Sequence, residues 1–233
     1  MDSTNLHLAR LRAAGKPVQI VLAETQTAGR GRRGRHWLSP PGCGLYLSWF
    51  HHFEQPAGQL GALGLVAGLA AANAVAKICA ITPGLKWPND LLINGRKAGG
   101  CLADLSPAKG ICSAIIGVGI NVDFNGLQGP DQPWTDLTRE TGQRVDRDRL
   151  AGALIHQLGV DIALFERAGL APFRRRWEAL DVLRGRPVQA SGALTGPVIG
   201  VAEGIDDQGR LLVRSGEKWF RLPSGEISLR TTE

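Results

Sequence analysis

The chain has 233 residues, 43% of them apolar, and a formal net charge of +6 at pH 7. This composition excludes a disordered chain, and the length allows one sizeable domain with a small second one. The first ten residues are polar, so we expect no signal peptide. The positive charge points to anionic partners such as nucleotide, nucleic acid or an acidic protein.

The first third of the chain predicts strands alternating with helices. In chain order, we expect a helix at 2–15, a strand at 18–23, a long loop at 26–44, a strand at 45–53 and a helix at 59–80. The last of these is apolar over almost the length of a membrane span. It is also rich in Ala and Gly and carries Asn73 and Lys77. We therefore predict a buried helix there and not a membrane span.

The rest of the chain changes its pattern near residue 184. Before that point, Asn94-Gly95 predicts a hairpin between two strands, and Asp146 caps a long helix. The expected elements are strands at 85–93, 96–105 and 111–124, a loop at 125–133, and helices from 146 to about 168 and from about 171 to 183. Afterwards only short β-like runs occur, at 188–190, 198–205, 211–214 and 218–222. We predict domains at 1–184 and 185–233, the second a small β-barrel.

Cysteine usage argues against a zinc or redox site. The four cysteines, at 43, 79, 101 and 112, include no C-x-x-C pair. Free thiols fit a reducing compartment, so we expect a cytoplasmic protein.

A Gly-Arg loop at 29–34, Gly-Arg-Gly-Arg-Arg-Gly, carries most of the functional information. It matches G-x-G-x-x-G, but Pro40-Pro41 block the helix that a dinucleotide site or a P-loop needs next. An RNA-binding Arg-Gly segment stays open as an alternative. We favour a flexible anion clamp, in which glycines permit close approach and arginines bind carboxylate or phosphate. Because its like charges repel, we expect this loop to be mobile until an anion binds.

Two further segments have polar or glycine-rich patterns. Lys86-Trp87-Pro88-Asn89-Asp90 begins the first hairpin strand, and Lys97 follows the turn. Asp90 can hold Mg²⁺ and Lys97 can neutralise a carboxylate or an α-phosphate, although an ordinary exposed turn explains the pattern equally well. Gly117 and Gly119 interrupt a β-branched strand, which indicates either close approach by a ligand or another backbone, or a bend.

Six segments together resemble the successive motifs of biotin protein ligases, in order and over nearly the whole chain. They are residues 2–5, 29–35, 86–90, 96–97, 117–121 and 225–230. The resemblance implies an α+β catalytic domain similar to class II aminoacyl-tRNA synthetases, with a mixed or antiparallel sheet and helices, followed by an SH3-like C-terminal barrel. It also implies an activity: biotin and ATP form biotinyl-5′-AMP, and biotin then passes to a lysine of a carrier protein.

The resemblance also implies roles for individual residues. The catalytic residues are expected to be Lys97, Arg32 and Arg30. Biotin is expected to contact Ser3, Thr4, Asn5, Gln26, Arg30, Gly31, Arg32, Lys97, Gly99, Gly117 and Gly119. ATP is expected to contact Arg32, Arg35, Trp37, Lys86, Asn89, Asp90, Asn121, Trp134 and Arg230.

The expected partners follow from the same resemblance. They are biotin, ATP with Mg²⁺ at Asp90, and the biotin carboxyl carrier domain of acetyl-CoA carboxylase or a related carboxylase, with no tightly bound cofactor and no membrane. The chain starts directly at the Ser3-Thr4-Asn5 motif, so we expect no N-terminal DNA-binding domain and no DNA partner. A homodimer is possible. The alternatives are a lipoate or octanoyl protein ligase of related fold and a basic RNA-binding module.

Overall fold

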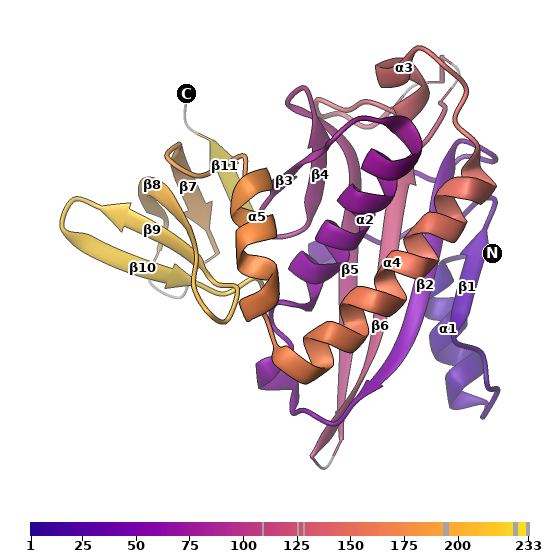
Figure 1. Ribbon diagram of the computed structural model, residues 1–233, viewed down its shortest axis with the longest axis horizontal. Coiled ribbons are helices and arrows are strands. Elements are labelled where there is room, and N and C mark those ends of the chain that lie inside the picture. The colour runs from indigo at the N-terminus through magenta and orange to yellow at the C-terminus, as the bar shows by residue number, and fades with distance from the viewer. Residues whose placement is uncertain (109, 125, 128, 193–195, 226–227, 232–233) are drawn as a thin grey trace.

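The computed structural model describes the whole chain except residues 109, 125, 128, 193–195, 226–227 and 232–233, together with the side chains of 228–231. Two separate sheets, both with antiparallel strand pairing, combine with helices in an α+β fold, as predicted. Figure 1 shows the larger sheet covered by helices on both faces and the smaller sheet beside it.

The larger sheet has three long central strands. In spatial order it consists of β1 (Ile20–Ala23), β2 (Gly44–Phe53), β6 (Ile111–Asn121), β5 (Arg96–Ala108), β4 (Asp90–Ile93) and β3 (Gly84–Lys86). Burial alternates along β6, with Ile116, Val118 and Ile120 buried and the glycines between them only partly buried. Because successive side chains point to opposite faces, the apolar residues and the glycines of β6 lie on different sides of the sheet.

Different helices cover the two faces of this sheet. α2 (Leu63–Cys79) and α4 (Arg147–Ala168) pack against each other and cover the apolar face, whereas α1 (Thr4–Ala13) lies on the opposite face (Figure 1). Leu8 of α1 packs there on Val21 and Phe50. The predicted burial of α2 is confirmed, and no helix in the described residues is long and apolar enough to cross a membrane.

The smaller sheet follows in the chain. Its strands, in spatial order, are β10 (Lys218–Leu222), β9 (Leu211–Ser215), β8 (Val198–Ile205), β7 (Pro187–Ser191) and β11 (Ser228–Thr231). The four predicted β runs are confirmed as β7 to β10, and β11 is an additional strand. Val188, Ala202 and Leu211 belong to the same buried cluster as α2. The domain boundary near residue 184 stays a prediction, since the apolar core runs on from one sheet to the other.

The predicted strand at 85–93 was wrong. The chain reverses within it, so that β3 and β4 pair with each other, and Lys86 lies opposite Asp90. The three residues between them contain Pro88, whose ring nitrogen has no hydrogen to donate to a neighbouring strand. The polar motif at 86–90 is therefore a tight turn at the sheet end and not a strand start. The Asn94-Gly95 hairpin between β4 and β5 is confirmed.

Two predicted helices were too long. The helix at 59–80 begins only at Leu63, because a 3-10 turn, η2 (Ala57–Gln59), precedes it. The helix at 171–183 is a 3-10 turn, η3 (Ala171–Phe173), followed by α5 (Arg174–Leu180). Beyond α5 the backbone N–H of Val182 donates to the carbonyl of Leu85, which draws the chain out of helical geometry. A short helix, α3 (Leu137–Thr141), was not predicted.

Candidate functional site

A cavity of about 340 Å³ opens on the glycine face of the larger sheet. Gly100 of β5 and Gly117 and Gly119 of β6 line its floor. A Cβ atom on Gly117 would lie 2.4 Å from Asn5 Oδ1, and one on Gly119 would lie 2.7 Å from the Trp37 ring. Side chains are therefore excluded from this floor. Close approach at these glycines is thus supported, although the groups that come close in the structure are the side chains of Asn5 and Trp37 and not another backbone.

One wall of the cavity is a network of buried neutral polar groups. Gln26 Oε1 accepts hydrogen bonds from the Thr4 backbone N–H at 2.8 Å and from the Thr4 hydroxyl at 3.1 Å. Gln26 Nε2 donates to Ser39 Oγ at 2.9 Å, and Ser48 Oγ donates to Asn5 Oδ1. Ser3, Thr4 and Asn5 are at most 5% exposed. Such a wall is rigid before any ligand arrives, because its members already hold one another in place.

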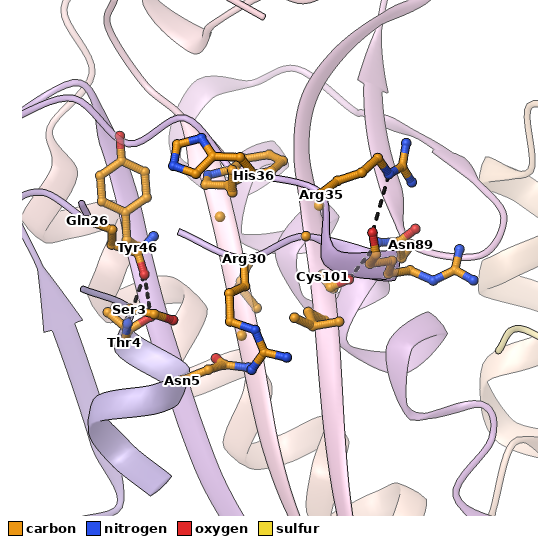
Figure 2. Close-up of a pocket in the computed structure, with 18 of the residues that line it drawn as sticks. Ser3, Thr4, Asn5, Gln26, Arg30, Arg35, His36, Tyr46, Asn89 and Cys101 are labelled. Atoms are coloured by element: carbon orange, nitrogen blue, oxygen red, sulfur yellow. Dashed lines mark hydrogen bonds between the residues drawn. The ribbon is translucent and has the colours of Figure 1, made fainter. Parts of the chain in front are cut away.

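Asp104 joins this wall to the Gly-Arg loop. Its Oδ2 accepts from Asn5 Nδ2 at 3.0 Å and from Arg30 Nη1 at 3.2 Å. Arg30 thereby lies over the middle of the cavity, between the polar wall and the side chains of Arg35 and Asn89 (Figure 2). Asp104 was not predicted. It lies two residues beyond Leu102 on β5, and the alternation of that strand places both on the cavity face.

The Gly-Arg loop has a defined fold. The Gly31 backbone N–H donates to the Arg35 carbonyl at 2.7 Å, and η1 (Arg32–Gly34) forms the tip between them. Arg32 Nη2 donates to the carbonyls of Ser224 and Gly225, the latter at 2.9 Å, in the connection between β10 and β11. Burial lowers the pKa of the Arg32 guanidinium. The C-terminal segment between β10 and β11 thus holds Arg32, which lines the cavity. The sequence pattern did not signal this contact.

Lys97 lies near Asn89, since a Cβ atom on Gly100 would lie 3.4 Å from the Asn89 carbonyl and 3.6 Å from Lys97 Cε. Figure 2 shows Asn89 on the far side of Arg30 from the polar wall, so Lys97 belongs to that end of the cavity. Its Nζ is 2.6 Å from Asp90 Oδ1 and 5.4 Å from the centre of the Trp37 ring. Its backbone N–H donates to the Pro133 carbonyl, and its own carbonyl accepts from the Thr135 N–H. The Lys97 side chain therefore lines the cavity, and its backbone fixes the segment 133–135, which precedes α3.

A smaller cavity of about 40 Å³ adjoins the first and shares Trp37 and Lys97 with it. Asn121 and Trp134 line it. The ring centres of Trp134 and Phe124 are 4.8 Å apart. The guanidinium carbon of Arg139 also lies 4.8 Å from the centre of the Trp134 ring. Asn121 Nδ2 donates to the Thr135 carbonyl at 3.0 Å. Two indole rings beside a cationic end suit a flat aromatic ligand that carries an anionic group.

Comparisons with known proteins agree with this geometry. Residues 2–121 match the model of the biotin/lipoate A/B protein ligase family, and residues 184–230 match the biotin protein ligase C-terminal domain. A biotin–[acetyl-CoA-carboxylase] ligase of Paracoccus denitrificans is 33% identical over 97% of this chain and 96% of that protein. The chain belongs to the biotin protein ligase family.

Other relatives of the family extend the comparison. The bifunctional ligase/repressor BirA of Escherichia coli K12 is 41% identical over 100% of this chain and 73% of that protein. The biotin protein ligase of Aquifex aeolicus in complex with biotin and ATP superposes with a TM-score of 0.83 at 32% identity, covering 99% of this chain and 96% of that one. The α+β fold with a small C-terminal sheet is therefore that of biotin protein ligases.

Most of the residues expected from the family resemblance meet in the main cavity. Those that line it are Ser3, Thr4, Asn5, Gln26, Arg30, Gly31, Arg32, Arg35, Trp37, Asn89, Lys97, Gly117 and Gly119. Further lining residues were not expected, and alternation along β2 and β5 could have signalled several of them. They include His36, Tyr46, Leu47, Gly100, Cys101, Leu102, Asp131 and Gln132. Among these, burial raises the pKa of the Cys101 thiol to about 12, so the thiol is protonated near neutral pH.

Some expected residues lie elsewhere. Gly99 does not line the cavity, because a Cβ there would lie 2.8 Å from the Gly119 carbonyl between two paired strands. Lys86 and Asp90 are not among the lining residues, although Asp90 pairs with Lys97 and its Oδ1 would lie 3.4 Å from a Cβ atom on Gly100, which does line the cavity. The side chain of Arg230 lies outside the described part of the chain, although its backbone pairs with β7. The binding and catalytic roles of all these residues stay predictions.

Replacing Gly117 with Ala is expected to reduce biotin affinity by at least an order of magnitude. The new methyl group must displace Asn5, whose Oδ1 would lie 2.4 Å away, and the rest of the polar wall with it. Isothermal titration with biotin alone measures the effect. Gly58→Ala is the matched control, since a Cβ at that position has no neighbour within 4 Å. Equal affinity of the Gly117 variant and the control would mean that biotin binds elsewhere.

Proposed function

We propose that this chain forms biotinyl-5′-AMP from biotin and ATP and transfers the biotinyl group to a lysine of a carboxylase carrier domain. The observation that carries the proposal is the order of groups along one cavity. A neutral hydrogen-bonding wall lies at one end, Arg30 of the Gly-Arg loop lies in the middle, and Lys97 of β5 lies at the other end, where an aromatic cavity adjoins. That order matches a ureido ring, a carboxylate beside a phosphate, and an adenine.

In the first step, biotin lies with its ring against Thr4, Asn5 and Gln26 and with its carboxylate towards Lys97. A carboxylate oxygen attacks the α-phosphorus of ATP, the new O–P bond forms, and pyrophosphate leaves with the electrons of the broken bond. The negative charge in the transition state is spread over phosphoryl and carboxylate oxygens. Lys97, Arg30 and Arg32 are placed to neutralise it, which is the main catalytic contribution that a fixed site can make here.

In the second step, the amine of the carrier lysine attacks the acyl carbon of the mixed anhydride. The amide bond forms, the bond between the acyl carbon and the phosphate oxygen breaks, and AMP leaves while the amine proton passes to solvent. Water competes with the lysine for this acyl group, so the intermediate must be shielded until the carrier arrives. The Gly-Arg loop, held across the cavity to the C-terminal sheet by Arg32, is suited to that shielding.

Magnesium is part of the proposal as the ion that accompanies ATP. No three metal-ligating side chains cluster in the described residues, so a protein cage for a metal is not formed there. Mg²⁺ typically keeps several waters and takes one or two protein carboxylates together with substrate phosphates. Asp90, at the end of the cavity that Lys97 and Asn89 mark, fits this role and would hold the ion. When bound, the ion supplies charge neutralisation for the pyrophosphate leaving group.

Biotin and lipoate are both substrates within the family whose model matches residues 2–121, so the acid itself has to be tested. The wall of amide and hydroxyl groups favours biotin, because the ureido group of biotin has N–H donors and a carbonyl acceptor to offer it, whereas the dithiolane ring of lipoate has neither. A competition assay with equal concentrations of biotin and lipoate, followed by mass spectrometry of a carrier domain, is expected to show only the biotinyl adduct. A lipoyl adduct in comparable yield would contradict the choice of substrate.

The RNA-binding alternative has less support. Arg30 is paired with Asp104, and Arg32 bonds the backbone carbonyls of Ser224 and Gly225, so two of the three arginines of the Gly-Arg loop are engaged within the protein. We further propose a cytoplasmic location, in which the four unpaired cysteines stay reduced. The absence of a DNA partner stays a prediction. So does a homodimer, for which the edge strand β1 is the candidate surface.

A further inference from the structure

Trp87 connects the two sheets of the molecule through its indole. It lies in the turn between β3 and β4, is 1% exposed, and its Nε1 donates a hydrogen bond to the Gly209 carbonyl at 3.0 Å. Gly209 belongs to the turn between β8 and β9 of the C-terminal sheet. A buried indole N–H is usually hydrogen-bonded, and the partner of Trp87 comes from the C-terminal sheet.

The turn at 206–210, which accepts this bond, is held by hydrogen bonds among its own residues. Asp206 Oδ1 accepts from the backbone N–H groups of Gln208 and Arg210, both at 2.9 Å, and Asp206 Oδ2 accepts from Arg210 Nε at 2.7 Å. Gly209 has φ +76°, and a Cβ there would lie 2.8 Å from Ala62 Cβ at the start of α2. The turn is thus preformed and seated directly against the catalytic domain.

In the sequence, Trp87 and Pro88 are followed directly by Asn89 and Asp90, which belong to the candidate site. Asn89 lines the cavity and is fixed to β5 from both ends, since its Nδ2 donates to the Cys101 carbonyl at 2.7 Å and its carbonyl accepts from the Cys101 N–H at 2.9 Å. Asp90 follows and holds Lys97. Trp87 itself does not line the cavity. A shift of the indole therefore reaches the lining through Asn89 and Asp90.

We propose that Trp87 is a positioning residue through which the C-terminal sheet sets the ATP end of the cavity. The inference rests on the proposed function, because it assigns Asn89, Asp90 and Lys97 to the nucleotide end. The polar wall of Thr4, Asn5 and Gln26 belongs to α1 and to the segment before the Gly-Arg loop, and it makes no bond to the 86–90 turn in the described residues. Loss of the hydrogen bond from the Trp87 indole should therefore weaken the binding of ATP without changing the affinity for biotin.

Trp87→Phe tests this, because it keeps an aromatic ring in the core and removes the N–H. We expect KM for ATP in pyrophosphate exchange to rise roughly tenfold, as loss of one partner of a buried hydrogen bond suggests. The affinity for biotin without ATP should stay within twofold of wild type. Trp177→Phe is the matched control: Trp177 is also 1% exposed, and its Nε1 has no hydrogen-bond partner in the described structure. That variant makes the same change of ring without breaking a hydrogen bond, and it should keep the wild-type KM for ATP and the wild-type affinity for biotin.

A second variant approaches the same contact from the other domain. Gly209→Ala must push the turn away from α2, and it should raise KM for ATP in the same way without altering biotin binding. The inference is wrong if Trp87→Phe and Gly209→Ala leave KM for ATP unchanged, if they weaken biotin binding equally, or if Trp177→Phe produces the same shift. Failure of the proposed function would look different, since the wild-type protein would then show no exchange at all.

Discussion

Lys97→Ala is expected to slow biotin-dependent ATP–pyrophosphate exchange by about one to two orders of magnitude. The substitution removes the ammonium group placed to neutralise the reacting anions, and a lost charged bond costs about 1.5–3 kcal/mol. It also leaves the Asp90 carboxylate without its cation 2.6 Å away, next to incoming phosphates. The rate should therefore fall in the adenylation step, which exchange of labelled pyrophosphate into ATP measures directly.

A matched control separates this effect from a general loss of charge. Lys77→Ala removes one positive charge from an exposed site on α2, behind the opposite face of the sheet, and should leave exchange unchanged. Biotin affinity without ATP should decrease less than the exchange rate in the Lys97 variant. An unchanged rate of pyrophosphate release in Lys97→Ala would remove Lys97 from the mechanism.

Arg32→Gly is expected to release biotinyl-5′-AMP into solution at least ten times faster than wild type. In the structure Arg32 connects the tip of the Gly-Arg loop to the carbonyls of Ser224 and Gly225, and it lines the cavity beneath. Its removal eliminates these charge-assisted bonds, each worth about 1.5–3 kcal/mol, while adding a flexible glycine. Release is measured by preloading the enzyme with labelled adenylate and following its loss on rapid gel filtration.

Arg33→Gly is the control for the same loop. Arg33 is exposed and has φ +59°, a left-handed conformation that glycine adopts without strain, so this substitution removes a charge without opening the loop. We expect it to retain the intermediate. If Arg32→Gly holds the adenylate as long as wild type, or if both variants leak alike, the loop is not what retains it.

Local patterns in the sequence predicted the parts of the fold that depend on near neighbours. Asn94-Gly95 marked the hairpin of β4 and β5, and the Ala-rich run marked the buried helix α2. The motif at 86–90 was placed on a strand, yet the chain turns there at Pro88, so that β3 pairs with β4. The bond from the Val182 N–H to the Leu85 carbonyl, which ends the helical segment after α5, comes from a distant part of the chain. Distant contacts of this kind leave no periodic signal.

The same distinction holds for the site. Motif resemblance brought together residues from α1, the Gly-Arg loop, β5 and β6, and all four segments line one cavity. Gly100 faces that cavity and Gly99 does not, because Gly100 lies opposite Gly119 in the register of β5 with β6, which the sequence does not mark. The bonds from Arg32 to Gly225 and from Trp87 to Gly209 span 193 and 122 residues of sequence, so only the folded chain reveals them.

The central claim is that one cavity brings a carboxylate and an ATP phosphate together between cations. Exchange of labelled pyrophosphate into ATP by the purified chain tests it most directly, with biotin and magnesium varied independently. We predict exchange that requires biotin, is not supported by lipoate, and coincides with thermal stabilisation by biotin. A folded protein that neither binds biotin nor catalyses the exchange would contradict the claim.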